Sequence, residues 1–371
     1  AIINFPYGFL ANVPLYYRAY PDSTLLEGTS EEVQLGVFSH FNTSIAGQTE
    51  VEVSFEEEDV TMELEIIGDN EIWPTIPVHG VQSAFDLNII ENSTEFIITV
   101  ESGGEPKSNQ LVEITAEWKQ DSGGHSHNGS KALKTPPPEL MGMFTNLSTE
   151  ESSQGFISVI TDSTGIVRLN FESPEFGGEV ELTARITDGE ETILSSQLLT
   201  MQVPDLMLLP DAPHIYKKVG GVPNHHGPRL DNRHSDHRTP DNNHWVNETV
   251  GQLLIALAVI YNEQFPDWEK IRYNDISLPN GGRFNIDGEW SGNRNHALHR
   301  LGFNVDVRTS PPREDGIPLE DLEEIQRIIE LLDPNAVIDV HGSRFIDSKT
   351  GNLVDSRHFH IDFRIFQVLQ P

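Results

Sequence analysis

The amino-acid sequence predicts a multidomain protein in which two all-β sandwiches precede an α+β domain with a small antiparallel sheet. Three observations lead to this prediction. The first two hundred residues contain short β-forming runs separated by Gly, Pro, Asn and Asp. The last third has apolar residues at three- and four-residue steps, which is the spacing of buried helices. At 371 residues, the chain is long enough for several separate cores.

The strand signals include residues 50–55, where polar and apolar residues alternate as in a strand with one solvent-exposed face. Similar runs recur at the spacing of antiparallel sandwiches. They are residues 62–66, 96–100, 111–118, 155–160, 166–171, 180–186 and 197–203. A Ser-Gly-Gly-Glu-Pro segment at 102–106 predicts a boundary, with one sandwich at 1–104 and a second at 105–204.

Residues 205–244 are rich in Pro, Asn and Asp and contain six His, with almost no apolar periodicity. This composition predicts an extended linker, so the sandwiches should be separable from the last third of the chain. The alternative is metal binding by a histidine cluster. Its members would be His225, His226, His234 and His237.

The domain predicted at 245–371 begins with a largely buried helix over residues 246–264. A second helix is predicted at 319–332, where one apolar stripe faces an acidic side and Asp333-Pro334 ends the pattern. Residues 336–340 and 359–368 then have the composition of strands. Together these elements predict an α+β fold.

Charge and composition limit the possible partners. The chain has 58 Asp and Glu against 24 Lys and Arg, a formal net charge of -34, which would repel phosphate backbones and excludes nucleic acid as an expected partner. It has no Cys, so neither disulfides nor thiolate ligands are available. No apolar run is long enough for a membrane span. The sequence starts at Ala1 with no charged-then-apolar segment, which is expected of a mature secreted chain and equally of a shortened sequence.

Four residues of the last third indicate a metal site. His299 and Asp306 are seven positions apart, and His358 and His360 form a His-x-His pair. Alternation along two strands places Asp306 on a polar face and puts both histidines of the pair on one face, so adjacent strands can bring these side chains together. His299 and Asp306 alone would favour a structural pair, but with the His-x-His pair they predict an open, catalytic metal centre.

The segment 296–306 resembles the His-x-x-His-x-x-Gly-x-x-x-Asp signature of penicillin-insensitive murein endopeptidases, which belong to one zinc superfamily with the lysostaphin-type and D-Ala-D-Ala metallopeptidases. Residues 355–360 resemble the closing motif of that family, and residues 277–284 resemble its Leu-Pro-x-Gly-Gly segment. The likeness covers roughly residues 245–366. Separately, residues 161–178 resemble bacterial Ig-like repeats of surface proteins, which implies an Ig-like sandwich at 105–204.

The resemblance implies Zn²⁺ bound by His299, Asp306 and His360. It places His358 at the non-ligating histidine that acts in catalysis and His296 at a second active-site histidine. Arg357 stands where the carboxypeptidases and dipeptidases of the superfamily carry a catalytic Glu, so only the histidine-assisted mechanism is expected here. Asp362 would orient one of the histidines or be a surface carboxylate, and His341 would face the cleft or lie outside it.

The expected function is therefore a zinc-dependent amidohydrolase, secreted or associated with the cell envelope, that cleaves peptide bonds in peptidoglycan or a similar cell-wall peptide. The expected location is extracellular, periplasmic or at the cell surface. The alternative is a structural or adhesive surface protein whose peptidase-like domain is inactive or serves for binding. Such a protein could also form homo-oligomers through its sandwiches.

Overall fold

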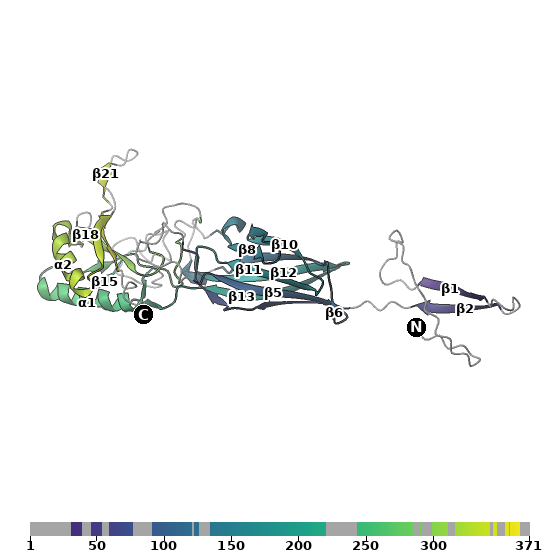
Figure 1. Ribbon diagram of the computed structural model, residues 1–371. Coiled ribbons are helices and arrows are strands. Elements are labelled where there is room, and N and C mark those ends of the chain that lie inside the picture. The colour runs from purple at the N-terminus through teal and green to yellow at the C-terminus, as the bar shows by residue number, and fades with distance from the viewer. Residues whose placement is uncertain are drawn as a thin grey trace. The chain divides into compact units, whose positions relative to one another are not determined.

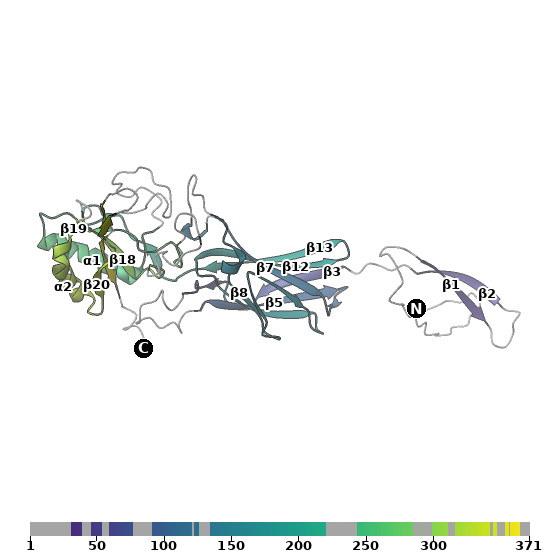
Figure 2. The ribbon, with the colours of Figure 1, turned by 90° about the horizontal axis from the view of Figure 1, so that it is seen from above.

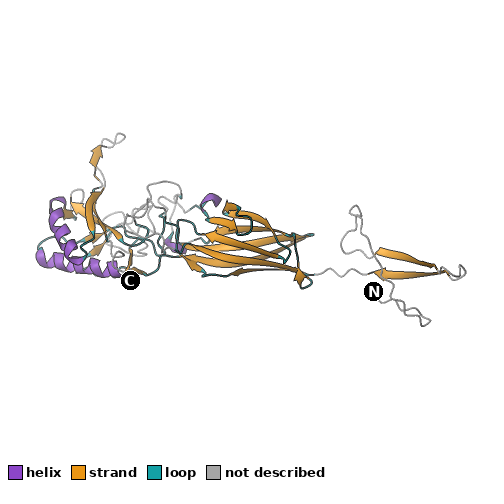
Figure 3. Ribbon diagram, in the orientation of Figure 1, coloured by secondary structure: helices purple, strands orange, loops and turns teal. Residues whose placement is uncertain are grey.

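The computed structural model describes residues 31–38, 46–53, 59–76, 91–120, 122–125, 134–219, 243–284, 290, 299–310, 316–341, 344–346, 353–355 and 357–363. The chain forms two compact units, residues 1–60 and 61–371. The described part is rich in β-strands, and both of its α-helices lie in the last third of the chain (Figure 3). A multidomain, β-rich fold is thus confirmed.

The first unit contains an antiparallel pair of strands, β1 (Glu31–Phe38) and β2 (Ala46–Val53) (Figure 1). Glu31 lies opposite Val53 and Phe38 lies opposite Ala46. The strand predicted at 50–55 overlaps the end of β2. This pair belongs to a different unit from the strands after residue 60, so the sandwich predicted at 1–104 is divided near that residue.

The second unit begins with a sandwich of two sheets (Figure 2). One sheet has the order β10-β7-β12-β13-β4, and the other has the order β3-β5-β11-β8-β9 with β6 beside β5. The strands are β3 (Val60–Ile66), β4 (Glu71–Ile72), β5 (Ser93–Ser102), β6 (Glu105–Pro106), β7 (Leu111–Trp118), β8 (Met143–Asn146), β9 (Ser152–Gln154), β10 (Phe156–Ile160), β11 (Ile166–Glu172), β12 (Gly178–Asp188) and β13 (Glu191–Met201).

The core of the sandwich follows from the predicted alternation. In β5 the side chains of Phe96, Ile98 and Val100 are fully buried, while the residues between them are more exposed. Phe144 of β8 packs against Phe171 of β11 with ring centroids 5.0 Å apart. In the other sheet, Val112 and Ile114 of β7 and Leu182 of β12 are fully buried as well, so each sheet buries one face.

The boundary predicted at 104/105 falls inside this sandwich, because β5 pairs with β11 and β4 pairs with β13. The Ser-Gly-Gly-Glu-Pro segment is a tight hairpin between β5 and β6, in which Ser102 lies opposite Glu105. Gly103 and Gly104 both have positive φ, as two-residue hairpin loops require. The two glycines, whose composition predicts a linker, instead form this turn.

The C-terminal part of the second unit has a small mixed sheet of order β15-β17-β18-β23-β20, with β19 beside β18. Its strands and those nearby are β14 (Leu206–Leu208), β15 (Lys217–Lys218), β16 (Trp245–Asn247), β17 (Arg272–Tyr273), β18 (Asn304–Ser310), β19 (Ile317–Pro318), β20 (Val337–His341), β21 (Arg344–Ile346), β22 (Leu353–Asp355) and β23 (His358–Asp362). The pairs β18–β23 and β20–β23, on which the site is built, are antiparallel.

Two helices pack on this sheet. Helix α1 (Glu248–Gln264) begins at Asn247, whose side chain accepts a hydrogen bond from the Thr249 amide at 3.0 Å. Helix α2 (Leu322–Leu332) buries Ile325, Ile328 and Ile329. Both helices lie close to their predicted bounds. No helix among the described residues is long and apolar enough to cross a membrane.

The predicted linker at 205–244 is partly built into this domain. Strand β14 pairs with β16 and β15 pairs with β17, and Leu209 and Tyr216 are fully buried in the same core as α1. The C-terminal domain therefore includes residues 206–219, and residues 61–371 form one compact unit. That the last third can be separated from the sandwich stays a prediction. The proposed cluster of His225, His226, His234 and His237 lies outside the described residues.

Candidate metal centre

The centre is built on two antiparallel strands whose register places Asp306 of β18 directly opposite His360 of β23. Directly paired residues of an antiparallel ladder project from the same face, so their side chains meet. His358 shares this face because it lies two residues before His360. The intervening Phe359, with Val305 and Val307, is buried on the opposite face and fixes the strands that carry the site.

His299 reaches the same point from the loop before β18. Gly302 has φ +72, and a side chain there would place its Cβ 2.9 Å from the backbone nitrogen of Asn247. The loop can therefore turn tightly into the strand only with glycine at this position. The Asn247 amide donates a hydrogen bond to the Gly302 carbonyl at 3.1 Å, which holds the turn against the start of α1.

The side chains of His299, Asp306 and His360 converge, with one potential ligand atom from each within 4.8 Å of the others. Asp306 Oδ1 lies 2.9 Å from His360 Nδ1 and 3.3 Å from His299 Nε2. All three residues are buried, with exposed fractions of 3–5%. Two imidazole nitrogens and one carboxylate oxygen in this arrangement could hold a metal ion.

The electrostatics of the group are those of a carboxylate surrounded by imidazoles. Burial alone would raise the pKa of Asp306, but His299, by its charge and hydrogen bond, and then His358 and His360 outweigh it and hold that pKa well below its ordinary value. Burial alone would lower the pKa of His299, and the charge of Asp306 more than offsets it, so that pKa is raised. Asp306 is therefore an anion that can attract a cation.

His358 and His341 lie at the more open side of the group. His358 Nε2 is 3.4 Å from Asp306 Oδ2, and 28% of its side chain is exposed. The ring of His341 stacks on that of His360, with centroids 4.3 Å apart, and its Nε2 is 2.8 Å from Asp339 Oδ1. Burial, and secondarily the charge of His360, lowers the pKa of His341. His341 therefore lies beside the centre.

Asn304 connects the centre to Asp362. Its Nδ2 donates to Asp362 Oδ1 at 2.9 Å and lies 3.4 Å from His360 Nε2. Both Asn304 and Asp362 are buried. Of the two interpretations of Asp362, the structure therefore favours the orienting carboxylate, which acts on His360 through the Asn304 amide.

Replacing Asp362 with Ala should weaken metal binding roughly 10–100-fold, the usual effect of losing a partner that orients a ligand. The Asn304 amide would lose its acceptor, and His360 would lose a fixed neighbour. Metal affinity measured by competition with a chelating dye checks this expectation. Asp339→Ala, which removes the carboxylate beside His341 on β20, is the comparison variant, and an equal loss there would argue against a specific role of Asp362.

The structure brings together four of the five site residues predicted from the sequence, namely His299, Asp306, His358 and His360. His296 lies outside the described residues. Sequence reasoning missed Asn304, although it shares the polar face of β18 with Asp306 by the same two-residue period. It also missed the link between Arg300 and Glu175, which are 125 residues apart.

Comparison with known proteins gives no family. No protein-family model matches the chain. No curated protein matches it either. Among solved structures, the chain is similar to a conjugative transposon lipoprotein from Bacteroides eggerthii, with 7% identity and a TM-score of 0.21, covering 37% of this chain and 95% of the other.

Proposed function

We propose that the chain is a zinc-dependent peptidase of the murein endopeptidase type, secreted or attached to the cell envelope. It would hydrolyse amide bonds in peptidoglycan or a similar cell-wall peptide. The observation that carries this proposal is the buried group of His299, Asp306 and His360 with the partly exposed His358 beside it. Three protein ligands would leave a coordination position for water, as in catalytic rather than structural zinc sites, and the accessible imidazole of His358 beside them supports this proposal.

The donor set favours a restricted choice of metals. Two histidines and a carboxylate are used by hydrolytic zinc sites and also by non-haem Fe(II) sites. The motif likeness of residues 296–306 and 355–360 to murein endopeptidases favours zinc. We accordingly propose a zinc-peptidase-like fold for the C-terminal domain and an Ig-like fold for the sandwich before it.

When bound, a zinc ion supplies Lewis-acid activation of water and of the scissile carbonyl. The chain supplies the remaining functions. His299, Asp306 and His360 would hold the ion, with Asn304 and Asp362 fixing the ring of His360. His358 would accept or steer the proton of the attacking water at Nε2, because this ring lies beside the ligands yet is open to solvent. The buried apolar face of β18 and β23 keeps these groups in place.

The proposal is tested by incubating the purified chain with isolated peptidoglycan and identifying the released fragments by mass spectrometry. Hydrolysis should release peptides with new amino and carboxyl ends, stop when a chelator is added, and return with added zinc. Retention of metal and binding to peptidoglycan without any cleavage would instead support the surface-binding alternative. Cleavage that persists in the metal-free chain would contradict the proposed mechanism.

A further inference from the structure

The loop that leaves the sandwich between β11 and β12 is joined to the C-terminal domain by backbone contacts. Phe176 forms an isolated antiparallel bridge with Gly282. The Arg283 amide donates to the Glu175 carbonyl at 2.7 Å, and the Gly282 amide donates to the Arg300 carbonyl at 2.8 Å. The sandwich loop is thereby connected, through residues 282–283, to the backbone beside His299.

Glycines allow this close approach on both sides. Gly282 has φ +75, and a Cβ there would lie 2.6 Å from the Gly177 nitrogen. A Cβ on Gly177 would lie 2.6 Å from the Asn280 carbonyl oxygen. Neither position accepts a side chain without moving backbone. The junction is therefore closely packed, and displacement of one side would displace the other.

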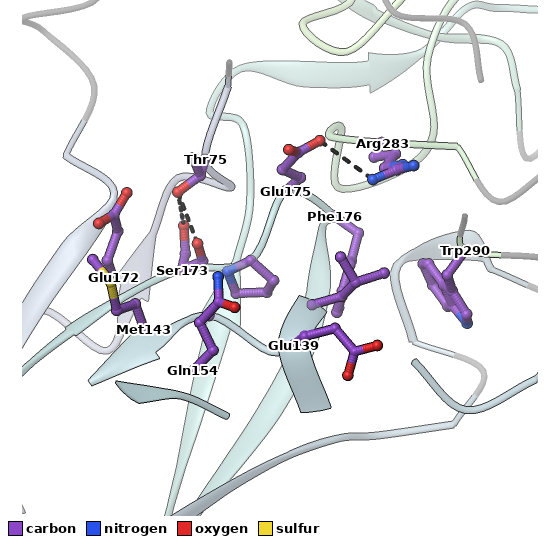
Figure 4. Close-up of a pocket in the computed structure, with 13 residues that line it drawn as sticks. Thr75, Glu139, Met143, Gln154, Glu172, Ser173, Glu175, Phe176, Arg283 and Trp290 are labelled. Carbon is purple, nitrogen blue, oxygen red and sulfur yellow. Dashed lines mark hydrogen bonds and ion pairs between the residues drawn. The ribbon is translucent and has the colours of Figure 1, made fainter. Parts of the chain in front are cut away.

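Two ion pairs of Glu175 join the same two segments of the chain. Glu175 Oε2 lies 2.8 Å from Arg300 Nη1 and 3.6 Å from Arg283 Nη1, and Figure 4 shows the Glu175–Arg283 pair beside a cavity of about 210 Å³. The Arg300 side chain is only 5% exposed. A guanidinium buried to this extent requires a carboxylate partner, and Glu175 is the one within ion-pair distance among the described residues.

Aromatic packing supports the same junction. Trp290 of the C-terminal domain packs against Phe176 of the sandwich loop, with ring centroids 4.7 Å apart. It also packs against Trp118, at the end of β7, at 5.4 Å. Figure 4 shows Trp290 and Phe176 side by side. The sandwich therefore presents Glu175 to Arg300 from a fixed position.

We propose that the sandwich positions the metal centre, with Glu175 holding Arg300 and so fixing the backbone of the adjoining ligand His299. Glu175 is a positioning residue in this arrangement, because it acts through Arg300 and touches no ligand atom in the described structure. This inference rests on the proposed metal site. It assigns the sandwich a part in forming the centre, in addition to any role in attachment to a surface.

Glu175→Gln in the full-length chain tests the proposal, since it removes the charge and keeps the shape. Glu181→Gln is the matched control: both glutamate side chains are 36% exposed, and Glu181 pairs with Lys119 at 2.7 Å within the sandwich. Glu175→Gln should weaken zinc binding about 10-fold, as expected for a group that orients a ligand from outside. It should also change the visible absorption of the Co²⁺-loaded chain, which reports ligand geometry.

The control variant should leave both zinc affinity and the Co²⁺ spectrum unchanged. The double variant Glu175→Gln with Arg300→Gln should bind zinc better than Glu175→Gln alone, because no buried charge is then left without its partner. If Glu175→Gln does not fold, Glu175→Asp is compared with the control variant instead, and its expected loss of zinc affinity is smaller.

Wild-type affinity and an unchanged Co²⁺ spectrum in Glu175→Gln would overturn the positioning role while leaving the metal site intact. An equal loss in Glu181→Gln would overturn it as well, by showing a general effect of the sandwich on stability. A wild-type chain that takes up no metal would overturn both the positioning role and the proposed function. A wild-type chain that binds zinc but hydrolyses nothing contradicts the proposed function alone.

Discussion

Replacing His299, Asp306 or His360 with Ala, one at a time, should remove most of the bound metal and all measurable hydrolysis. Each residue supplies one of the three converging ligand atoms, and two remaining ligands hold zinc poorly. The loss of metal affinity should exceed the roughly 10–100-fold decrease that follows removal of a residue that only orients a ligand. Elemental analysis after dialysis against metal-free buffer, compared with the wild-type chain, measures it.

The exposed His214 provides a control, because His214→Ala removes one histidine without touching the centre. This variant should keep its full metal content. Full zinc occupancy in all three ligand variants would rule out the site. Iron instead of zinc in the wild-type chain would leave the ligands in place but would contradict the hydrolytic assignment.

The sequence predicted the local features of this fold because they depend on short-range periods. The two-residue alternation of β5, β18 and β23 follows directly from side-chain direction in strands. It predicted that adjacent strands could bring Asp306 and His360 together, and the structure adds the register that places them directly opposite each other. The helical stripes of α1 and α2 were equally recognisable. The metal group could be predicted because its residue types are chemically restricted.

Long-range features could not be predicted in the same way. The Gly103-Gly104 turn has the composition of a linker, and only the pairing of β5 with β11 shows that one sandwich includes both sides of it. Tyr216 lies in a polar, proline-rich stretch, and its burial depends on strands and a helix elsewhere in the chain. Asn304 and Glu175 are common polar residues whose roles depend entirely on their partners, Asp362 and Arg300.

His358→Ala should leave zinc bound yet slow hydrolysis roughly 10²–10⁴-fold, the usual effect of losing a positioned general acid or base. Its ring lies beside Asp306 but is 28% exposed, whereas the side chains of His299 and His360 are 5% and 3% exposed. A group that exchanges protons with substrate and water needs that access, and a ligand does not. Metal content and turnover are measured on the same preparation.

If His358→Ala released zinc as readily as His360→Ala, His358 would be a ligand and the roles of the two histidines would be inverted. Full activity of His358→Ala on a proven substrate would instead exclude His358 as the acid or base of the reaction, although its ring lies 3.4 Å from Asp306.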